Sequence, residues 1–395
     1  MLLLPLQGIA TGLIPARPPA PAPRPSQPLL PGCEPRCRGC AHRHLSAQDS
    51  ERQKFDWLAD KLSPWADRLA AIHAVCGEAR RGYRERVCLK AQWLDSRWHI
   101  GMPLNEDNVL DLPACPVHSP RVNAALAALK PVLPDGARFP LAYFVQNARQ
   151  LVLVLKTAQL PATDWLSAAA VAALRTAGID GLWLHLHPAV GKRIFNKPGW
   201  HLLWGEARSR DDDGLWYGPA AFRQPIPGLA AAALDAAERF LSPEPGDLLI
   251  DLCSGNGGSL RRWYAAGADS VGVELSGEAC ACAANNVPGA LTLRGSCSQR
   301  LPQLAERTAR CSGPGFRLVY ANPPRTGLEP EVCRWLVESC RPARMACLSC
   351  SAGTLRRDLD QLCAAGYRVE RLLPYDFFPR TYHVETLALL QRESD

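Results

Sequence analysis

Long uncharged hydrophobic runs are absent from this chain of 395 residues. No stretch approaches the roughly 18 apolar residues that a membrane-spanning helix requires, so we expect no such helix and no membrane partner. The first residues, MLLLPLQGIATGL, resemble a secretory signal only briefly, because Pro5 and Gly8 interrupt them and no basic segment precedes them. Because a proline-rich tract follows, we interpret residues 1–32 as a disordered tail.

Lysine is scarce as well. Of the 45 basic residues only seven are lysine, and none of them follows Lys197. The rest are arginine, whose guanidinium group binds phosphate through two parallel hydrogen bonds. With a net charge of +7, this composition is compatible with a nucleic-acid partner.

An export signal is missing, although the chain contains 16 cysteines. Disulfide bonds are then not expected, and a reducing cytoplasm is the favoured location. Some thiols serve metal binding or catalysis in such a chain, and most of the others are small buried hydrophobic residues. The hydrophobic content of 47% and the charged content of 21% are typical of a soluble globular protein. The length predicts two or three domains.

Three structured regions follow the tail. Residues 33–120 begin with a cysteine-rich segment and continue with strand-like segments. Residues 121–215 combine strand-like segments with an alanine-rich helix, which predicts a small central α/β domain that we expect to bind RNA. Here His185 and His187 lie two apart on one strand, so we favour a half-exposed strand face over the alternative of a metal site.

The third region, residues 216–395, has the most regular pattern. Strand-like and helical segments alternate five times, which predicts an α/β fold with a doubly wound parallel sheet. No helix separates the last two strand-like segments, so we expect one antiparallel strand. In sheets of this kind, ligands bind beyond the carboxyl ends of the strands.

A glycine-rich turn follows the first strand of this region. In DLCSGNGG, Gly255 and Gly257 let the backbone turn sharply, and Glu274 ends the next strand, where an acid can accept hydrogen bonds from ribose hydroxyls. The third glycine of the dinucleotide fingerprint is missing, because Leu260 stands at its place. The spacing is instead typical of S-adenosylmethionine binding. A structural turn with a solvated glutamate is the alternative.

Two further strand ends carry reactive side chains. In YANPPRTG, the prolines make the loop rigid, which would aim the Asn322 amide at a flat heterocycle, and Arg325 could hold a phosphate or order the loop. In LSCSAGTL, Cys350 ends an apolar run just before a helix. We favour a nucleophile at the edge of the sheet over an inert core thiol.

A cysteine cluster opens the structured part of the chain. Cys33, Cys37 and Cys40 are closely spaced, and Cys115 stands apart with a proline after it. Three clustered thiols and one remote cysteine before proline form a recurrent iron–sulfur arrangement. Zinc, with His42 or His44 as a further ligand, is the alternative.

Six motifs together carry a resemblance. They occur in the order FRQ (222–224), DLCSGNG (251–257), VGVEL (271–275), ANPPRTG (321–327), SCSAGTLRRDL (349–359) and DFFPRTYHVE (376–385). This set resembles the uracil-5 RNA methyltransferase family, which forms 5-methyluridine in tRNA and ribosomal RNA. The resemblance implies a Rossmann-like class I methyltransferase domain with a mostly parallel seven-stranded sheet.

The resemblance also implies roles for individual residues. Cys350 would be the nucleophile and Glu385 the base that removes a proton. S-adenosylmethionine or the target base would be contacted by Gln224, Cys253, Gly255, Gly257, Glu274 and Asn322. A 4Fe–4S cluster would be held by Cys33, Cys37, Cys40 and Cys115, because the ribosomal-RNA branch of the family carries one.

The leading hypothesis is therefore a cytoplasmic, monomeric enzyme that methylates a uridine of 23S ribosomal RNA. The same reaction on tRNA is an alternative. Another is a non-catalytic RNA-binding homologue, because Cys253, Ser296 and Ser351 depart from the family pattern. A methyltransferase for small molecules is a third, although such an enzyme would not need the cysteine cluster.

Overall fold

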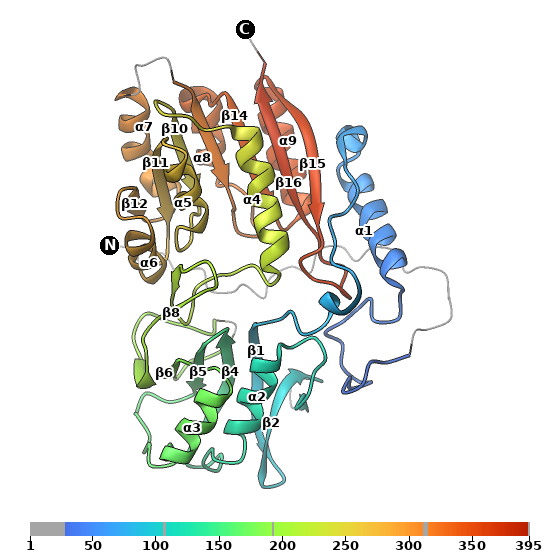
Figure 1. Cartoon of the computed structure of the whole chain (residues 1–395), viewed down its shortest axis with the longest axis vertical. Helices are drawn as coiled ribbons and strands as arrows, with labels where there is room; N and C mark the ends of the chain where they lie inside the picture. Colours follow the sequence, from blue (N-terminus) through green and yellow to red (C-terminus); the bar gives the residue numbers. More distant parts are fainter. Residues whose placement is uncertain (1–27, 106–107, 192, 311–314, 394–395) are drawn as a thin grey trace.

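The computed structural model describes residues 28–105, 108–191, 193–310 and 315–393 (Figure 1). Most of the predicted tail, residues 1–27, lies outside these ranges. Its last residues do not fit the prediction, because Leu29, Leu30 and Gly32 line a cavity next to the cysteine cluster. Within the described ranges, no helix combines the length and the apolarity needed to cross a bilayer.

The C-terminal half of the chain forms a seven-stranded sheet with the order β12-β11-β10-β13-β14-β16-β15. Neighbouring strands from β12 to β14 are parallel, whereas β16 runs antiparallel to both β14 and β15. The doubly wound sheet and its one reversed strand are thus confirmed. The strands are β10 (Leu248–Leu252), β11 (Asp269–Glu274), β12 (Leu291–Arg294), β13 (Arg317–Ala321), β14 (Arg344–Ser349), β15 (Tyr367–Tyr375) and β16 (Glu385–Arg392).

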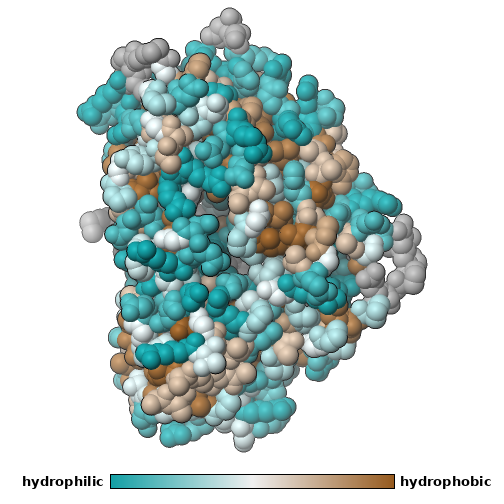
Figure 2. Space-filling model, in the orientation of Figure 1, coloured by the Kyte–Doolittle hydropathy of each residue, from teal (hydrophilic) through white to brown (hydrophobic). Residues whose placement is uncertain are grey.

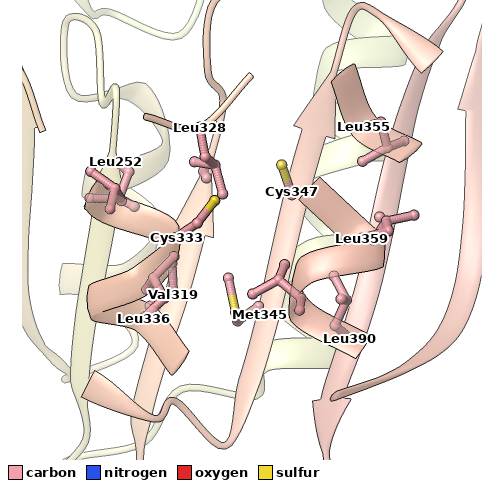
Figure 3. Packing of buried hydrophobic residues seen from close by; sticks show 14 of the residues in the cluster. Leu252, Val319, Leu328, Cys333, Leu336, Met345, Cys347, Leu355, Leu359 and Leu390 are labelled. Atoms are coloured by element: carbon pink, nitrogen blue, oxygen red, sulfur yellow. The ribbon is translucent and has the colours of Figure 1, made fainter. Parts of the chain in front are cut away.

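Helices cover both faces of this sheet. Along β10, Ile250 packs into one buried cluster and Leu249 into another, because successive side chains of a strand point to opposite faces. Figure 3 shows the first cluster, in which α8 and α9 pack on the sheet and the thiols of Cys333 and Cys347 lie among leucine side chains. The helices are α4 (Pro227–Leu241), α5 (Gly258–Ala265), α6 (Gly277–Asn286), α7 (Leu301–Arg310), α8 (Pro330–Trp335, continued by a π-helical turn Leu336–Cys340) and α9 (Ala352–Ala364).

A second sheet has the order β3-β2-β1-β4-β5-β6-β7 and lies below the first in Figure 1. Helices α2 (Pro120–Leu129) and α3 (Ala168–Thr176) bury their apolar sides against one face of it. The domain boundary expected after residue 120 is wrong, because β1 pairs with β4 across it. Pairing between strands so far apart in the chain leaves no local signal. The strands are β1 (Arg86–Leu94), β2 (Arg97–Pro103), β3 (Val109–Asp111), β4 (Leu141–Asn147), β5 (Gln150–Leu155), β6 (Gly181–Leu186) and β7 (Trp200–Gly205).

His185 of β6 and His187, which follows the strand, lie on the other face of this sheet. The expected half-exposed face is wrong, because His185 is 0% and His187 7% exposed. The rings of Phe195 and Trp200 pack against His185, and its Nε2 accepts a hydrogen bond from the amide of Asn196 at 3.1 Å. This cover comes from Phe195 in the irregular segment after β6 and from Trp200, the residue of β7 that pairs with His185. The alternation of β6 alone could reveal neither.

The N-terminal region is attached to the C-terminal half of the chain and not to the second sheet alone. Helix α1 (Ala47–Lys61) lies beside β15 in Figure 1, and Leu58 belongs to the same buried cluster as α9. Two short 3₁₀ turns follow, Ser63–Arg68 and Gly77–Arg80. Isolated bridges join Leu69 to Leu372 and His73 to Tyr375, which covers the outer edge of β15.

The two halves are joined by an extended segment with a small hairpin, β8 (Ser209–Arg210) and β9 (Trp216–Tyr217). Figure 2 shows that hydrophilic residues dominate the visible face across both halves, with apolar residues in smaller groups between them. This distribution is typical of a water-exposed surface.

Candidate active site

Two strand ends bring Cys350 and Glu385 together. Strand β14 runs antiparallel to β16, and the last residue pair of their ladder is Ser349 with Thr386. Cys350 follows Ser349 and Glu385 precedes Thr386, so the next pair in this register is Cys350 with Glu385. Both residues therefore lie at the edge of the sheet where the parallel strands end.

The Cys350 thiol is half-buried and close to charged groups of both signs. Burial raises its pKa to about 11, and the neighbouring Glu385 carboxylate acts in the same direction. The guanidinium of Arg325 opposes this shift through its charge and a hydrogen bond to the thiol. Without a bound substrate, the thiol is thus mostly protonated at neutral pH.

The turn after Cys350 is held by short-range hydrogen bonds. The hydroxyl of Ser349 accepts a bond from the Ser351 amide at 3.3 Å. The hydroxyl of Thr354 contacts the carbonyl of Arg325 at 3.2 Å and that of Ser351 at the same distance. These bonds tie the start of α9 to the loop after β13, so the thiol and Arg325 keep their relative positions.

The Glu385 carboxyl is 4% exposed, and burial raises its pKa to about 7. Its Oε2 accepts a hydrogen bond of 2.8 Å from Nε2 of Gln224, and this bond and the charge of Arg325 partly offset the shift. The sequence predicted that Gln224 contacts the cofactor or the base. In the structure its amide nitrogen holds the carboxylate, while its Oε1 has no partner among the described residues.

Arg325 is the residue that the sequence reading did not connect to the thiol. It lies in the rigid loop NPPRTG after β13, and its charge acts on Cys350, Glu385 and His383. Its position in the loop suggested that Arg325 orders the loop or binds a phosphate. Nothing in the sequence around Arg325 indicates that its guanidinium contacts the Cys350 thiol.

The glycine-rich turn and Glu274 also come together. The Glu274 carboxylate accepts hydrogen bonds from the amide of Gly255 at 3.0 Å and from that of Ser276 at 2.7 Å. Gly255 and Gly257 have φ angles of +58° and +86°, which favour glycine. Burial raises the pKa of Glu274. The carboxylate is thus fixed directly beside the turn.

Cys253 and Asn322 flank this turn. Cys253 has a φ of +63°, which is unusual for a residue with a side chain, and its Sγ lies 3.8 Å from Sγ of Cys297. The backbone amide of Asn322 donates a hydrogen bond to the carbonyl of Leu252 at 3.1 Å. Asn322 therefore follows the strand next to the glycine-rich turn, at the same edge of the sheet.

Asp251 is a second residue to which the sequence reading gave no role. It begins the DLCSGNG motif, is 0% exposed, and has its pKa raised to about 7 by burial. Its Oδ2 accepts a hydrogen bond from Nε1 of Trp263 at 2.9 Å, whereas Oδ1 has no partner among the described residues. The place of this acid at the head of the motif is the signal that could have singled it out.

The four cysteines of the N-terminal cluster line one cavity, at whose rim Arg380 also lies. The remote Cys115 reaches it because the chain after it pairs with residues 82–84 through backbone hydrogen bonds. The pKa of Cys40 is raised to about 11 by burial and by the charges of Cys115 and Cys37. The amide of Gly39 donates to Sγ of Cys37 at 3.4 Å. The residues of the cavity are Leu29, Leu30, Gly32, Cys33, Glu34, Cys37, Cys40, Arg43, Leu112, Cys115, Pro116, Val117 and Arg380.

The donor set of this cavity bears on the kind of metal that it suits. His42 is not part of the lining, and its Nδ1 is 2.9 Å from the hydroxyl of Ser50. Across the described ranges, no three His, Cys, Asp or Glu side chains converge as ligands of one metal ion. The four thiols share the lining of one cavity.

The segment that leads to Glu385, residues 376–384, is held by the N-terminal region. Nζ of Lys54 lies 2.6 Å from Oδ1 of Asp376, and both side chains are fully buried. The amide of His42 donates to the carbonyl of Arg380 at 2.9 Å. The hydroxyl of Tyr83 donates to the carbonyl of Pro379 at 3.0 Å. The cysteine region and the approach to the active site thus form one packed unit.

Comparisons with known proteins agree with this arrangement. The family model described as tRNA (Uracil-5-)-methyltransferase matches residues 311–393, which include Cys350 and Glu385. The 23S rRNA (uracil(1939)-C(5))-methyltransferase RlmD of Thiobacillus denitrificans is 29% identical over 382 residues, which cover 91% of this chain and 85% of the relative. The 23S rRNA (uracil(747)-C(5))-methyltransferase RlmC of Shigella flexneri is 26% identical, covering 91% of this chain and 98% of the relative.

A solved structure shares the fold over most of the chain. It is the Pyrococcus abyssi tRNA (uracil-54, C5)-methyltransferase in complex with S-adenosyl-L-homocysteine, with a TM-score of 0.66 and 22% identity, covering 90% of this chain and 86% of that one. The fold, the matched family model and the relatives along nearly the whole length agree. Along nearly its whole length the chain is similar to members of the uracil-5 RNA methyltransferase family.

Proposed function

We propose that the protein is an S-adenosylmethionine-dependent RNA methyltransferase that forms 5-methyluridine in 23S ribosomal RNA. The observation that carries this proposal is the pairing of Cys350 with Glu385 at the same edge of the sheet, with Arg325 and Gln224 against them. The relatives named as 23S rRNA uracil-C5-methyltransferases support the reaction and the class of RNA.

The chemistry explains why a thiol is needed. Carbon 5 of uracil is too weak a nucleophile to attack a sulfonium methyl group. The Cys350 thiolate adds to carbon 6, and the electrons of the ring double bond move toward carbon 5 and the carbonyl oxygen, which makes carbon 5 reactive. The target base must leave the RNA stack to reach this site. Arg325 stabilises the thiolate, because its guanidinium is the positive group beside the sulfur.

Release of the enzyme requires a base. S-adenosylmethionine would supply the methyl group that becomes bonded to carbon 5, and its sulfur would keep the electrons of the broken sulfur–methyl bond and leave as S-adenosylhomocysteine. The Glu385 carboxylate then takes the remaining carbon 5 proton, the ring double bond re-forms, and the Cys350 thiolate leaves carbon 6. With a pKa of about 7, Glu385 is a stronger base than an exposed glutamate. Gln224 keeps the carboxylate in place through its hydrogen bond.

The glycine-rich turn suits S-adenosylmethionine. Glu274 would accept hydrogen bonds from the ribose hydroxyls, and the turn at Gly255 and Gly257 lets the backbone approach the cofactor. Asn322 and Cys253 would border the same pocket.

Methyl transfer tests the proposal. The purified protein should transfer a labelled methyl group from S-adenosylmethionine to 23S ribosomal RNA that lacks the modification. Cys350→Ala should lower the rate by more than about 1,000-fold, because the covalent step is lost. Cys363→Ala is a matched control on α9 and should keep the wild-type rate. No transfer by the wild type, or undiminished transfer by Cys350→Ala, contradicts the proposal.

Mapping of the product separates the remaining alternatives. Mass spectrometry of the methylated RNA should find 5-methyluridine in 23S ribosomal RNA, whereas methylation of tRNA alone would move the protein to the tRNA branch. Calorimetry with S-adenosylmethionine distinguishes an enzyme from a non-catalytic homologue. Micromolar binding excludes a decayed pocket, and absence of binding would support one.

We also propose that Cys33, Cys37, Cys40 and Cys115 hold a 4Fe–4S cluster. Two observations support this assignment. The four thiols line one cavity. The amide of Gly39 donates a hydrogen bond to Sγ of Cys37, and hydrogen bonds to the sulfurs are typical of such sites. The methyl transfer needs no electrons, so the cluster would serve folding or RNA docking. Iron and sulfide analysis of anaerobically purified protein should find about four of each per chain, and zinc in their place would contradict the assignment.

The location and the oligomeric state belong to the same proposal. A ribosomal-RNA substrate and the many free thiols favour the cytoplasm. We expect a monomer in solution, which light scattering at micromolar concentration can check.

A further inference from the structure

We propose that a second cavity binds a backbone phosphate of the RNA substrate close to the target uridine. This arginine cavity is lined by His42, Leu45, Ala47, Gly77, Arg80, Arg81 and Arg380. Its volume of about 210 Å³ far exceeds the roughly 10–15 Å³ that a single water needs. The inference deepens the proposed function, on which it rests, by naming where the RNA backbone is held.

The charge in the cavity favours an anion. Arg80 forms an ion pair of 3.1 Å with Glu51, and Arg81 one of 3.1 Å with Glu78, whose side chain is 83% exposed. Arg380 has no carboxylate at ion-pair distance among the described residues. The three guanidinium groups are therefore balanced by only two carboxylates, which leaves one positive charge in excess. Guanidinium groups bind phosphate with two parallel hydrogen bonds.

Besides the arginines, the lining consists of the His42 ring, Gly77 and the apolar side chains of Leu45 and Ala47. Electrostatic attraction is stronger in such a partly enclosed site than on an open surface.

The cavity is close to the reactive pair. Arg380 precedes Glu385 by five residues, so their Cα atoms are at most about 18 Å apart. Ring contacts lead from the cavity toward the site, with 6.5 Å between the centroids of His42 and Tyr382 and 4.4 Å between those of Tyr382 and His383. His383 in turn lies near Arg325, the partner of the thiol. Phosphates next to a flipped-out uridine fall within this range.

The backbone holds Arg380 in a defined position. Its φ angle is +69°, a conformation that residues with side chains rarely adopt. The hydrogen bond from His42 to its carbonyl and the buried pair of Lys54 with Asp376 fix the segment around it. A preset guanidinium loses little freedom on binding, which suits a group that positions RNA rather than one that only attracts it.

Salt dependence of RNA binding tests the inference. The dissociation constant of undermodified 23S ribosomal RNA is measured against KCl concentration for the wild type and for Arg81→Gln, Arg80→Gln/Arg81→Gln and Arg380→Gln. Loss of one phosphate contact should flatten the slope of log K against log salt by about 0.7–0.9. For Arg81→Gln and Arg80→Gln/Arg81→Gln, KM for RNA should rise several-fold, while kcat at saturating RNA and the affinity for S-adenosylmethionine stay unchanged.

Two further variants make the test specific. Arg368→Gln is the matched control, because Arg368 also pairs with a nearby acid, Glu370, but at the opposite end of β15. It should leave the slope unchanged. Glu78→Gln removes a competing carboxylate and should tighten RNA binding about two- to fivefold.

The outcomes separate this inference from the proposed function. If the wild type methylates RNA and the arginine variants keep the wild-type slope and KM, the cavity is not a phosphate site and only the inference is overturned. If the wild type transfers no methyl group, the proposed function fails first. Arg81 has a 44% exposed side chain, so its replacement leaves the fold intact, and unchanged calorimetry with S-adenosylmethionine verifies this.

Discussion

Lys54 and Asp376 form a fully buried ion pair of 2.6 Å that joins helix α1 to the segment before Glu385. Nζ of Lys54 also contacts the carbonyl of Phe378 at 3.4 Å. Burial lowers the pKa of Lys54, and the Asp376 carboxylate opposes this shift. The pair therefore anchors the N-terminal region to the segment that leads to the Glu385 carboxyl group.

Breaking this pair should destabilise the protein. We expect Lys54→Met to lower the free energy of unfolding by about 3–5 kcal/mol, because Asp376 would be left buried without a partner. Urea unfolding followed by fluorescence measures the loss. Lys61→Met is the control, since Lys61 pairs with Asp60 in solvent and should change stability by less than about 1 kcal/mol. Lys54→Met with Asp376→Leu should recover much of the loss, and equal effects of both lysine variants would contradict the anchoring role.

The reactivity of Cys350 should depend on its two charged neighbours. At pH 8, Glu385→Gln should speed alkylation of Cys350 by iodoacetamide roughly three- to tenfold, because the carboxylate that raises the thiol pKa is gone. Arg325→Gln should slow it by a similar factor. Peptide mapping by mass spectrometry follows Cys350 separately from the other thiols, and Cys76, which is exposed, is the internal control. Equal rates in all three proteins would show that these charges do not act on the thiol.

The rate of methyl transfer should depend on pH through Glu385. Its pKa is raised to about 7, so the carboxylate that accepts the proton is lost as the pH falls through 7, and kcat should fall with it. Gln224→Leu removes a hydrogen bond that lowers this pKa, which should move the acidic limb of the profile to higher pH. The profile of kcat between pH 5 and 9 checks both statements. An acidic limb near the ordinary glutamate value would contradict them.

Cofactor affinity should depend on Glu274. We expect Glu274→Gln to weaken S-adenosylmethionine binding by roughly 10- to 100-fold, since hydrogen bonds to a charged acceptor contribute about 1.5–3 kcal/mol. Calorimetry measures the dissociation constant. Glu331→Gln, at an exposed position of α8, should keep the wild-type value. An unchanged affinity of Glu274→Gln would remove this acid from the cofactor site.

Much of the fold was predictable because its signals are local. The alternation of strands and helices and the missing helix before the last strand predicted the doubly wound sheet with one reversed strand. The end of β14 and the start of β16 could be paired once the reversal was known, so the meeting of Cys350 and Glu385 followed from the motifs.

Contacts between distant segments were not predictable. The pairing of β1 with β4, the cover over His185 and the bond from Gln224 to Glu385 each join residues whose sequence neighbourhoods carry no mark of the partner. The sequence singled out Arg325 because of its rigid loop, but it did not predict the contact of Arg325 with the Cys350 thiol. A guanidinium can bind phosphate, carboxylate or thiolate, so the residue type does not identify the partner.

The reversed direction of β16 has a consequence for how the site tolerates change. Six residue pairs, from Arg344 with Gln391 to Ser349 with Thr386, align Cys350 with Glu385. Insertions between β15 and β16 would fall in residues 376–384 and would disturb their packing against the N-terminal region. Removal of a single residue inside β16 would turn Glu385 to the other side of the sheet and separate it from Cys350.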